Sequence, residues 1–411
     1  MTDDIFEIEP LEMVHGGQTL ARHAGRVIFT PYTIPGERCV ARIVDDRGRF
    51  AFAQSIDVVA PSPQRVTPRC PHFGPGLCGG CHFQHIDYAA QPAYKRDVVI
   101  DQLTRIGGIP DPVVHPAIPS PEPWGYRVHA TFHVNEAGDL CFVGTDGETL
   151  VPVDECHIIR PELLELLDEL ALDDIPELER MRVQIGSDGA RMVVLSTRDD
   201  DAPELEVTIP VSVNLLLSDN EPVNLIGASH TVYAVHGRRF RVTAGGFFQV
   251  NIPQAETLVD LVLQRLDLRG DETVLDLYAG VGLFTAFIAE RAALVTSIES
   301  YPPAVTDADE NLSDLDNVDL IEGSVEDVLP ELSEQYDAIV LDPPRAGVDA
   351  RALDLIDTLG ARRIVYVSCE PSTLARDAKR LVAKGWQLVD TQPVDMFPQT
   401  YHVECVAYFA R

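Results

Sequence analysis

The chain changes its pattern of hydrophobic and polar positions near residue 250. Up to about residue 59, short runs alternate residue by residue between turns, as in "GERCVARIVDDRGRFAFAQSIDVVAP". This alternation is typical of a small antiparallel β-barrel. Residues 126–242 continue the strand-like alternation around one helical segment, "RPELLELLDELAL". From residue 252 on, helical segments alternate with short apolar runs, which predicts a parallel sheet doubly wound by helices.

These changes predict three domains. We expect a small β-barrel over 1–62, a β-rich central domain over 63–245, and a Rossmann-like, doubly wound α/β domain over 246–411. The four prolines of "APSPQRVTPRCP" mark a linker behind the barrel. A helix at about 88–108 has apolar spacing and a terminal glycine pair, and we expect it to pack on the last domain.

The composition is that of a soluble protein with an unusual charge. The 411 residues are 45% hydrophobic, and no apolar run approaches the length of a membrane span. The first residues do not form a secretory signal, so we expect a cytoplasmic protein without a membrane partner. We also expect a monomer. The formal net charge is −33, with 65 acidic residues and 32 basic ones. Such acidity makes nucleic acid an unexpected partner and favours adaptation to salt. "GRRFRVT" is one local cationic segment that could contact RNA or simply expose strand arginines.

Two predicted strands end in acidic residues that could hold a cofactor. "VLDLYAGVGLF" carries Asp276 near the strand end and then Gly280 and Gly282, while the following strand ends in Glu299. Glycines there let the backbone approach a ligand, and a carboxylate at a strand end accepts hydrogen bonds from a ribose or an ammonium group. A dinucleotide site would carry a third glycine where this chain has Thr285. The pattern therefore favours S-adenosylmethionine over NAD.

Three further residues are candidates for chemistry. Asp342 closes a strand at "VLDPPRAG", and Cys369 follows another at "YVSCEPSTLARD", where a nucleophile would face the same sheet edge. Glu404 lies beside His402 in "TYHVECVA" and could accept a proton. Taken singly, each also fits a structural role as a strand stop, a buried thiol or a surface carboxylate.

A cluster of cysteines precedes the predicted helix. "CPHFGPGLCGGCHFQH" contains Cys70, Cys78 and Cys81, which could bind a metal, form disulfides or take part in catalysis. In a reducing compartment, clustered cysteines are more often ligands than disulfides.

Taken together in this order and spacing, "FFQVN", "DLYAGVGLF", "DPPRAG", "YVSCEPSTLARD" and "MFPQTYHVE" resemble the RNA uracil-C5 methyltransferases. The resemblance covers essentially the full chain. It implies that Cys369 is the nucleophile and that Glu404 removes a proton. It also implies S-adenosylmethionine as methyl donor, contacted by Gln249, Tyr278, Glu299 and Asp342.

The resemblance extends to the first half of the chain. The predicted barrel looks like the TRAM domain of this family, and "CGGCHFQHIDYAAQPAYK" looks like its iron–sulfur segment. The resemblance implies a [4Fe–4S] cluster held by Cys70, Cys78, Cys81 and Cys156. Thiolates suit zinc as well as iron–sulfur, so the choice of iron comes from the resemblance. The other three cysteines, apart from Cys369, are expected to be core or surface thiols: Cys39, Cys141 and Cys405.

The chain departs from the family pattern at two positions. Leu283 stands where a polar cofactor contact is expected, and Glu370 follows Cys369 where Asn is usual. A carboxylate beside the thiol should raise its pKa unless it points away. We therefore expect Glu370→Asn to keep or increase activity.

The resemblance favours RNA as partner, with 23S rRNA as the leading target and the T-loop of tRNA as its rival. The target base must leave its stack to meet Cys369, which favours loops over perfect helices. Two other functions stay open. A guanine N-methyltransferase would share the DPP motif without needing Cys369, and a non-catalytic RNA-binding iron–sulfur scaffold would keep the fold without turnover.

Overall fold

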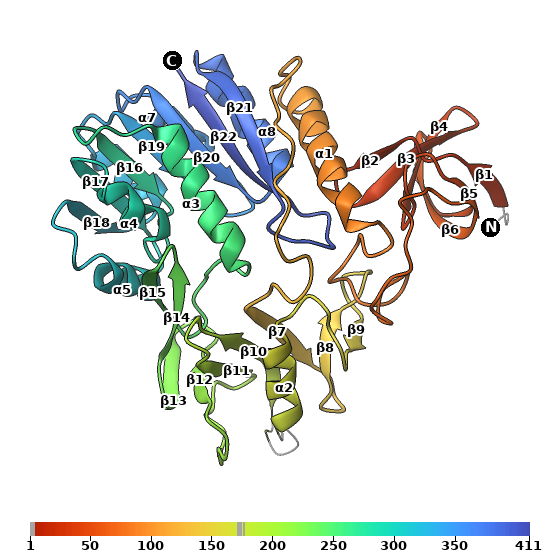
Figure 1. Cartoon of the computed structure of the whole chain (residues 1–411), viewed down its shortest axis with the longest axis horizontal. Coiled ribbons are helices and arrows are strands. Elements are labelled where there is room, and N and C mark those ends of the chain that lie inside the picture. The colour runs from red at the N-terminus through yellow and green to blue at the C-terminus, as the bar shows by residue number, and fades with distance from the viewer. Residues whose placement is uncertain (1–4, 171–174, 176) are drawn as a thin grey trace.

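The computed structural model of the chain describes residues 5–170, 175 and 177–411. A small barrel lies at one side, a second β-sheet lies below, and the large α/β sheet lies at the other side (Figure 1). Among the described residues, none of the helices combines the length and the apolar character that a membrane crossing requires. The doubly wound α/β domain, preceded by a barrel and a β-rich region, is the predicted fold class.

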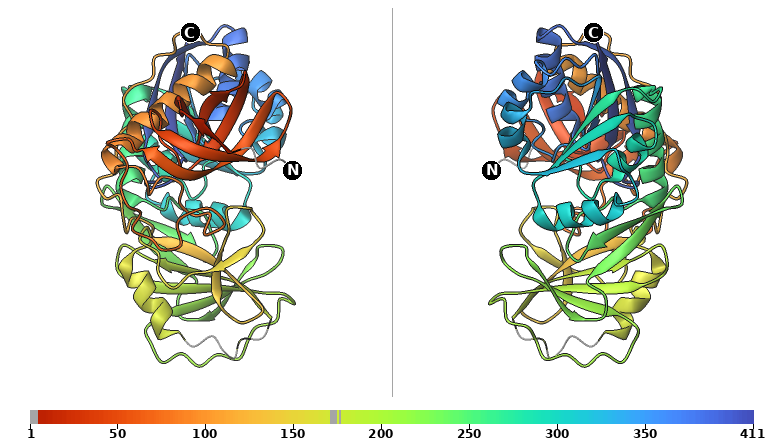
Figure 2. Two further views of the ribbon diagram at one scale, coloured as in Figure 1. Left: turned by 90° about the vertical axis from the view of Figure 1, so that its right-hand side faces the viewer. Right: turned by 90° about the vertical axis from the view of Figure 1, so that its left-hand side faces the viewer.

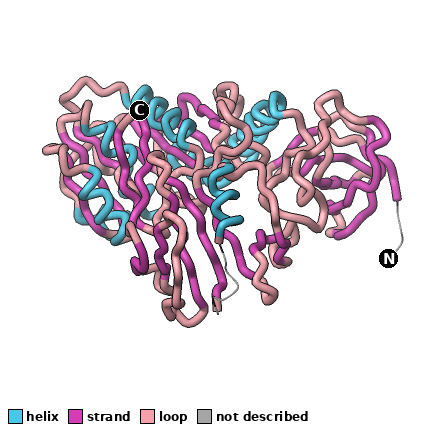
Figure 3. The backbone as a smooth tube through the Cα atoms, turned by 60° about the horizontal axis from the view of Figure 1, so that its bottom comes forward, coloured by secondary structure: helices cyan, strands magenta, loops and turns pink. Residues whose placement is uncertain are grey.

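The barrel is a six-stranded sheet in the order β1-β5-β6-β4-β3-β2. Its strands are β1 (Ile5–Ile8), β2 (Glu12–Val14), β3 (Gln18–His23), β4 (Arg26–Pro31), β5 (Arg38–Asp46) and β6 (Phe50–Ala60). Alternate residues point inward, and most of them are small, among them Ala21, Cys39 and Ala51. Small inner side chains let so few strands close around one core. Figure 3 shows this region as strands and loops without helices.

The segment after the barrel crosses to the α/β domain. A short 3-10 helix, η1 (Tyr88–Ala90), leads into α1 (Gln91–Arg105), which covers most of the predicted helix. Helix α1 packs against α8 (Pro371–Ala383). The chain then runs beside β21 (Gln387–Val394), where Val114 pairs with Thr391 and Ile118 with Val394. Both the helix and the strand-like segment after it therefore belong physically to the α/β domain.

The central sheet has seven strands in the order β13-β12-β11-β10-β7-β8-β9. They are β7 (His129–Val134), β8 (Leu140–Val143), β9 (Leu150–Pro152), β10 (Leu178–Ile185), β11 (Arg191–Thr197), β12 (Ser212–Leu216) and β13 (Pro222–Ile226). Helix α2 (Pro161–Glu169) buries Leu163 and Leu166 against this sheet. The predicted helix "RPELLELLDELAL" thus forms in part, and its residues 171 and 172 lie outside the described residues.

A separate hairpin, β14 (His230–Val235) and β15 (Arg238–Thr243), joins the central sheet to the α/β domain. Nη2 of Arg238 lies 2.5 Å from Oδ1 of Asp314, and Nε of Arg241 lies 2.9 Å from Oδ1 of Asp307. Both carboxylates belong to α5 (Pro302–Asn311) or follow it directly. Two guanidinium groups of the predicted cationic segment therefore hold the hairpin to the α/β domain.

The α/β sheet has the order β18-β17-β16-β19-β20-β22-β21, and β22 runs antiparallel to both of its neighbours, β20 and β21, whereas the other neighbouring pairs are parallel. Its other strands are β16 (Thr273–Leu277), β17 (Leu294–Glu299), β18 (Val318–Glu322), β19 (Ala338–Leu341), β20 (Arg363–Ser368) and β22 (Glu404–Ala410). The remaining helices are α3 (Ile252–Leu266), α4 (Leu283–Ala289), α6 (Val325–Val328), η2 (Leu329–Glu331) and α7 (Ala350–Ile356). The strand order reverses between β16 and β19, where such sheets bind their ligands.

Helices cover both faces of this sheet. One apolar cluster packs α3, α4 and α5 on one face, and another packs α1, α6, α7 and α8 on the opposite face. The strands between them are apolar almost throughout, as expected for a parallel sheet buried on both sides. Figure 2 shows the layers from two sides, with the barrel in front of the α/β domain in the left view.

Candidate active site and cysteine cavity

A tight turn after β16 shapes the ligand edge of the α/β sheet. Tyr278, Gly280 and Gly282 all have positive φ, and Gly282 is the N-cap of α4. The Glu299 carboxylate joins the turn, since its Oε2 accepts a hydrogen bond from the Gly280 N–H at 2.8 Å. Its Oε1 accepts from the N–H groups of residues 300 and 301. The predicted ribose-binding residue is thus fixed by three backbone donors beside the glycine turn.

Asp276 is fully buried beneath this turn. Its Oδ2 accepts a hydrogen bond from Thr285 Oγ1 at 2.5 Å, but its Oδ1 is buried without a partner among the described residues. Burial raises the pKa of Asp276 to about 7, and nearby Glu299 adds to the shift. The pKa of Asp342 is also raised to about 7, first by burial and then by Asp276. A buried acceptor without a donor is costly, so this edge is suited to a ligand that brings N–H or O–H groups.

The other two predicted cofactor residues are Tyr278, which lies in this turn, and Gln249, which comes from another part of the chain. The Tyr278 hydroxyl donates to Glu326 Oε1 at 3.2 Å. Gln249 is buried in the segment that leads into α3, and its side chain forms no hydrogen bond with the other predicted cofactor residues among those described. Leu283, the departure noted in the sequence, is the first residue of α4 and packs in the apolar core. Glu299 and Asp342 are linked through Asp276, whose pKa Glu299 raises and which in turn raises the pKa of Asp342.

Cys369 and Glu404 lie on neighbouring strands. The last registered pair between β20 and β22 is Ser368 with Cys405, so Cys369 and Glu404 occupy the next positions at the sheet edge. Burial raises the pKa of Glu404 well above its usual range, and Asp342 raises it further. The pKa of the half-buried Cys369 thiol is raised to about 12 by burial, then by Glu404 and Asp342, whereas Arg345 lowers it.

The segment 395–403, which we call the strap, leads from β21 into β22 and carries a buried ion pair. Lys95 of α1 places its Nζ 2.5 Å from Asp395 Oδ1, and both side chains are fully buried. The same ammonium donates to the Phe397 carbonyl at 2.9 Å. Breaking such a pair leaves one uncompensated buried charge, so this contact fixes the strap on α1.

Gln399 fastens the strap at a second point. The Gln91 side chain bonds to it twice: Gln91 Nε2 donates to Gln399 Oε1, and the backbone N–H of Gln399 donates to Gln91 Oε1, both at 3.0 Å. The Gln399 carbonyl accepts from the N–H groups of His82 and Phe83 at 2.9 Å. Gln399 itself has a φ of +68°. The strap therefore joins the segment next to Cys81 to the strand that begins with Glu404.

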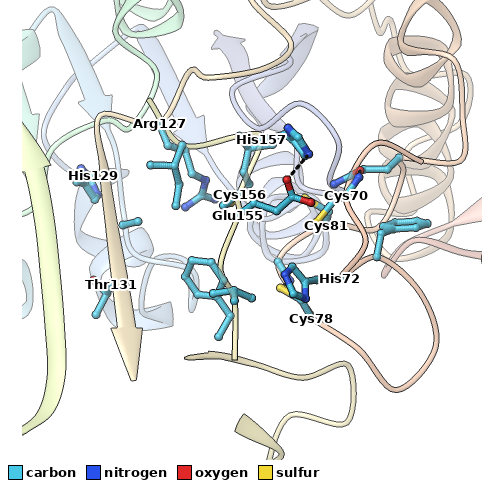
Figure 4. Close-up of a pocket in the computed structure, with 18 residues that line it drawn as sticks. Cys70, His72, Cys78, Cys81, Arg127, His129, Thr131, Glu155, Cys156 and His157 are labelled. Atoms are coloured by element: carbon cyan, nitrogen blue, oxygen red, sulfur yellow. Dashed lines mark hydrogen bonds and ion pairs between the residues drawn. The ribbon is translucent and has the colours of Figure 1, made fainter. Parts of the chain in front are cut away.

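The four predicted ligand cysteines line one cavity of about 320 Å³ (Figure 4). Cys70, Cys78 and Cys81 come from the loop before α1, and Cys156 comes from the segment between β9 and α2. Burial raises the pKa of all four thiols, to about 12 for Cys81 and about 11 for Cys156. Within the described ranges, no three His, Cys, Asp or Glu side chains are grouped as for a single metal ion.

Contacts around the cavity join segments that are far apart in the sequence. Cys78 forms a β-bridge with Gly144, and His72 Nε2 lies 2.7 Å from Asp154 Oδ1. Arg127 lines the cavity, and its Nε is buried without a partner among the described residues. In the view of Figure 4, Arg127 lies near Cys156, and Cys70, Cys78 and Cys81 lie farther from it.

Some of the groups at these sites could not be recognised from the sequence. Arg345 stands in the quoted "DPPRAG" motif, yet nothing in that motif indicates that its charge lies near Cys369. The sequence did offer a reason to single out Lys95, because it is one of three lysines and lies within the predicted amphipathic helix. Arg127 and Gln399 carry no sequence signal, since their neighbours come from remote parts of the chain. Cys39, Cys141 and Cys405 are buried, in agreement with core thiols.

Comparisons with known proteins extend over the whole chain. Residues 229–411, which begin just before β14, match the family described as tRNA (Uracil-5-)-methyltransferase. An uncharacterized RNA methyltransferase of Streptomyces coelicolor is 37% identical, covering 98% of this chain and 92% of that protein. One of Halalkalibacterium halodurans is 35% identical, covering 98% and 96%. The crystal structure of Pyrococcus abyssi tRNA (uracil-54, C5)-methyltransferase with S-adenosyl-L-homocysteine matches with a TM-score of 0.75 and 25% identity, over 98% of this chain and 99% of that one.

Proposed function

Because the chain belongs to the S-adenosylmethionine-dependent RNA uracil-C5 methyltransferases, we propose that Cys369 is its nucleophile and Glu404 its base. The observation that carries this proposal is the adjacency of the two residues across β20 and β22. A non-catalytic scaffold would have no need of this pairing, and a guanine N-methyltransferase would have no need of Cys369.

The proposed reaction follows from the weak nucleophilicity of uracil C5. The Cys369 thiolate adds to C6, and the electron pair of the C5–C6 bond moves to C5 and its conjugated carbonyl. C5 then takes the methyl group from the sulfonium, and S-adenosylhomocysteine is released. Glu404 removes the remaining C5 proton, the C5–C6 double bond re-forms, and the thiolate leaves C6. The enzyme thiol is thereby regenerated, and the net product is 5-methyluridine.

Burial raises the pKa of both residues, with different consequences for the two proposed roles. The raised pKa of Glu404 makes its carboxylate a stronger base than an exposed Glu once it is ionised. The raised pKa of Cys369 keeps the thiol protonated in the free protein, so it must lose its proton when substrate arrives. A thiol that ionises only in the complex is protected from unproductive reactions.

For the methyl donor we propose contacts with Gln249, Tyr278, Glu299 and Asp342. The strongest support is the buried Asp276 Oδ1, which lacks a donor among the described residues and lies beneath the same turn. An amino acid ammonium or a ribose hydroxyl would satisfy such an acceptor.

We also propose that Cys70, Cys78, Cys81 and Cys156 bind a [4Fe–4S] cluster. The cavity that all four cysteines line supports it. The partnerless Arg127 Nε in the cavity wall offers positive charge toward four thiolates. When bound, the cluster would fasten the loop before α1 to the central sheet, since methyl transfer moves no electrons.

As target we propose 23S rRNA, on the resemblance to the branch with a barrel and a cluster. The second candidate is the T-loop of tRNA, which the Pyrococcus abyssi structure favours. That structure matches over 98% of this chain, so the overall fold does not separate the two targets. Local arginines would have to provide the RNA contacts on a chain of net charge −33.

One experiment tests the reaction and the target together. Anaerobically purified protein is incubated with labelled S-adenosylmethionine and 5-fluorouridine-substituted total RNA, and a denaturant-resistant protein–RNA adduct is sought. Fluorine at C5 blocks the last proton removal, so an adduct is expected for the wild type and not for Cys369→Ala. Sequencing the trapped RNA identifies the target. Methyl transfer to ordinary RNA without any adduct would contradict the covalent reaction.

A further inference from the structure

The turn between β2 and β3 reaches the active edge of the α/β sheet. It consists of His15, Gly16 and Gly17, and we call it the barrel turn. Its two glycines have φ values of +90° and +76°. Nε2 of His15 lies 3.1 Å from Oε1 of Glu370, the residue that follows Cys369. A side chain of the N-terminal barrel thus touches the neighbour of the proposed nucleophile.

The barrel turn also packs closely against the strap. A Cβ atom placed on Gly17 would lie 3.1 Å from both Cβ and Cδ1 of Tyr401, so only glycine fits there without displacement. The His15 ring meets the Tyr401 ring edge-on, with centroids 6.0 Å apart. Met13 is buried beside this contact, in the apolar cluster that α1 shares with the barrel. The barrel is therefore docked where the strap leads into Glu404.

Glu370 has a defined place at the start of α8. It is the N-cap residue, and its Oε1 accepts from Ser372 Oγ at 2.8 Å and from the Ser372 N–H at 3.3 Å. The two donor groups of Ser372 hold this oxygen at the start of α8, and Nε2 of His15 lies 3.1 Å from it. The charged groups that act on the thiol pKa of Cys369 come from elsewhere: Glu404 on β22, Asp342 after β19, and Arg345.

We propose that His15 and Glu370 are positioning residues, and that the barrel turn holds the Glu370 carboxylate at α8 and away from the Cys369 thiol. The inference rests on the proposed role of Cys369. A carboxylate free to approach the thiol would disfavour the thiolate, because like charges close together oppose ionisation. Docking of the barrel would then be a condition for a reactive nucleophile.

The test measures how fast Cys369 is alkylated by iodoacetamide in the full-length protein without RNA or methyl donor, over a range of pH. Mass spectrometry of the Cys369 peptide separates this thiol from the other cysteines. His15→Ala is expected to slow alkylation by about tenfold and to move its pH profile upward, the effect of a one-unit rise in pKa. Glu370→Gln is not expected to slow it.

The double variant distinguishes a positioning role of His15 from a general disturbance of the fold. His15→Ala combined with Glu370→Gln should react like Glu370→Gln alone, because a neutral amide cannot repel the thiolate wherever it points. If His15→Ala merely disturbed the fold, the double variant would be as slow as the single one, and the inference would be overturned. An unchanged rate in His15→Ala, relative to the barrel variant His23→Ala, would overturn it as well.

Two glycine variants give a matched second measurement. Gly17→Ala and Gly16→Ala carry similar backbone strain, but a Cβ on Gly16 meets nothing within 4 Å. Gly17→Ala should therefore slow alkylation, and Gly16→Ala should not. Equal rates in the two would count against a role for the docked turn.

The alkylation assay is independent of the proposed function. If the wild type forms no adduct with 5-fluorouridine RNA, the proposed reaction fails, whereas the dependence of Cys369 on His15 is still measured. If the adduct forms but the alkylation rate of Cys369 is the same in the His15 and Glu370 variants as in the wild type, only this inference fails.

Discussion

The edge of the α/β sheet and the cysteine cavity both gather acidic groups whose pKa is raised by burial, yet the two are assembled differently. At the sheet edge, Asp276, Asp342, Cys369 and Glu404 lie in or directly beside neighbouring strands, so the order of the sheet brings them together. In the cavity, three cysteines share one loop, and Cys156 arrives from a segment beyond the first three strands of the central sheet.

This difference decides what each site needs in order to form. The strands of the sheet edge are held by two apolar cores, so its geometry exists before any ligand binds. The cavity is closed by loops, whose thiols are protonated when free because burial raises their pKa. The proposed cluster would require those thiols to lose protons, and on that proposal the cavity would depend on its ligand for charge balance and rigidity. Each of the following predictions changes one part of this comparison and names the measurement that reports on it.

The largest effect is expected from Glu404→Gln. Without a base for the C5 proton, turnover should fall by at least about 100-fold. Methylated RNA should remain attached to Cys369, so a covalent species should accumulate with ordinary RNA and appear as a shifted band in a denaturing gel. The matched control is Glu322→Gln at the end of β18. Normal turnover in Glu404→Gln would refute its role, and iron content should be unchanged in either variant.

Cys156→Ser tests the cavity. Loss of one thiolate should remove most of the iron and sulfide from anaerobically purified protein, together with the visible absorbance of a cluster. Cys141→Ser is the control, because Cys141 is a buried thiol of β8 that does not line the cavity. Zinc in place of iron, or full iron in Cys156→Ser, would contradict the proposed cluster.

The strap connects the two sites, and Lys95→Met tests that connection. Leaving Asp395 without its buried partner should lower the free energy of unfolding by about 3–5 kcal/mol, measured by urea titration. Lys384→Met removes a partly exposed ion pair with Asp354 and should cost no more than about 1 kcal/mol. The double variant Lys95→Met, Asp395→Leu should lose less free energy of unfolding than Lys95→Met alone, because it leaves no unpaired charge in the core. Equal losses for the two lysines would mean that the buried pair does not hold the strap.

The smallest effect is expected from Arg345→Ala. The Cys369 pKa of about 12 means that thiolate is rare at neutral pH, so its alkylation should grow steadily as pH rises toward that value. Removing the Arg345 charge raises this pKa further and should slow alkylation by about threefold at low salt, since exposed charges contribute little. High salt should reduce the difference through screening. Arg351→Ala on α7 is the control and should not change the rate.

The sheet edge was largely predictable from the sequence because strand ends carry its chemistry. Short apolar runs locate the strands, and parallel strands must present their carboxyl ends at one edge, so the order of residues along the chain is enough to group Asp276, Glu299, Asp342 and Cys369. The fold class followed from the same alternation.

The contacts between domains could not be predicted in this way. His15 with Glu370, Lys95 with Asp395, and Gln91 with Gln399 each join residues about 300 positions or more apart. No periodicity specifies such pairs, because they depend on how finished domains dock. The same limit explains why the arginines of "GRRFRVT" looked available for RNA, although Arg238 and Arg241 bind carboxylates at α5.

The position of β22 has a consequence for protein synthesis. This strand follows β21 in the chain but lies between β20 and β21 in the sheet, and it begins with Glu404. While a ribosome is still translating that strand, the sheet has a gap beside Cys369 and the proposed base is missing. On the proposed mechanism, the active edge is therefore complete only once β22 has inserted between its two neighbours.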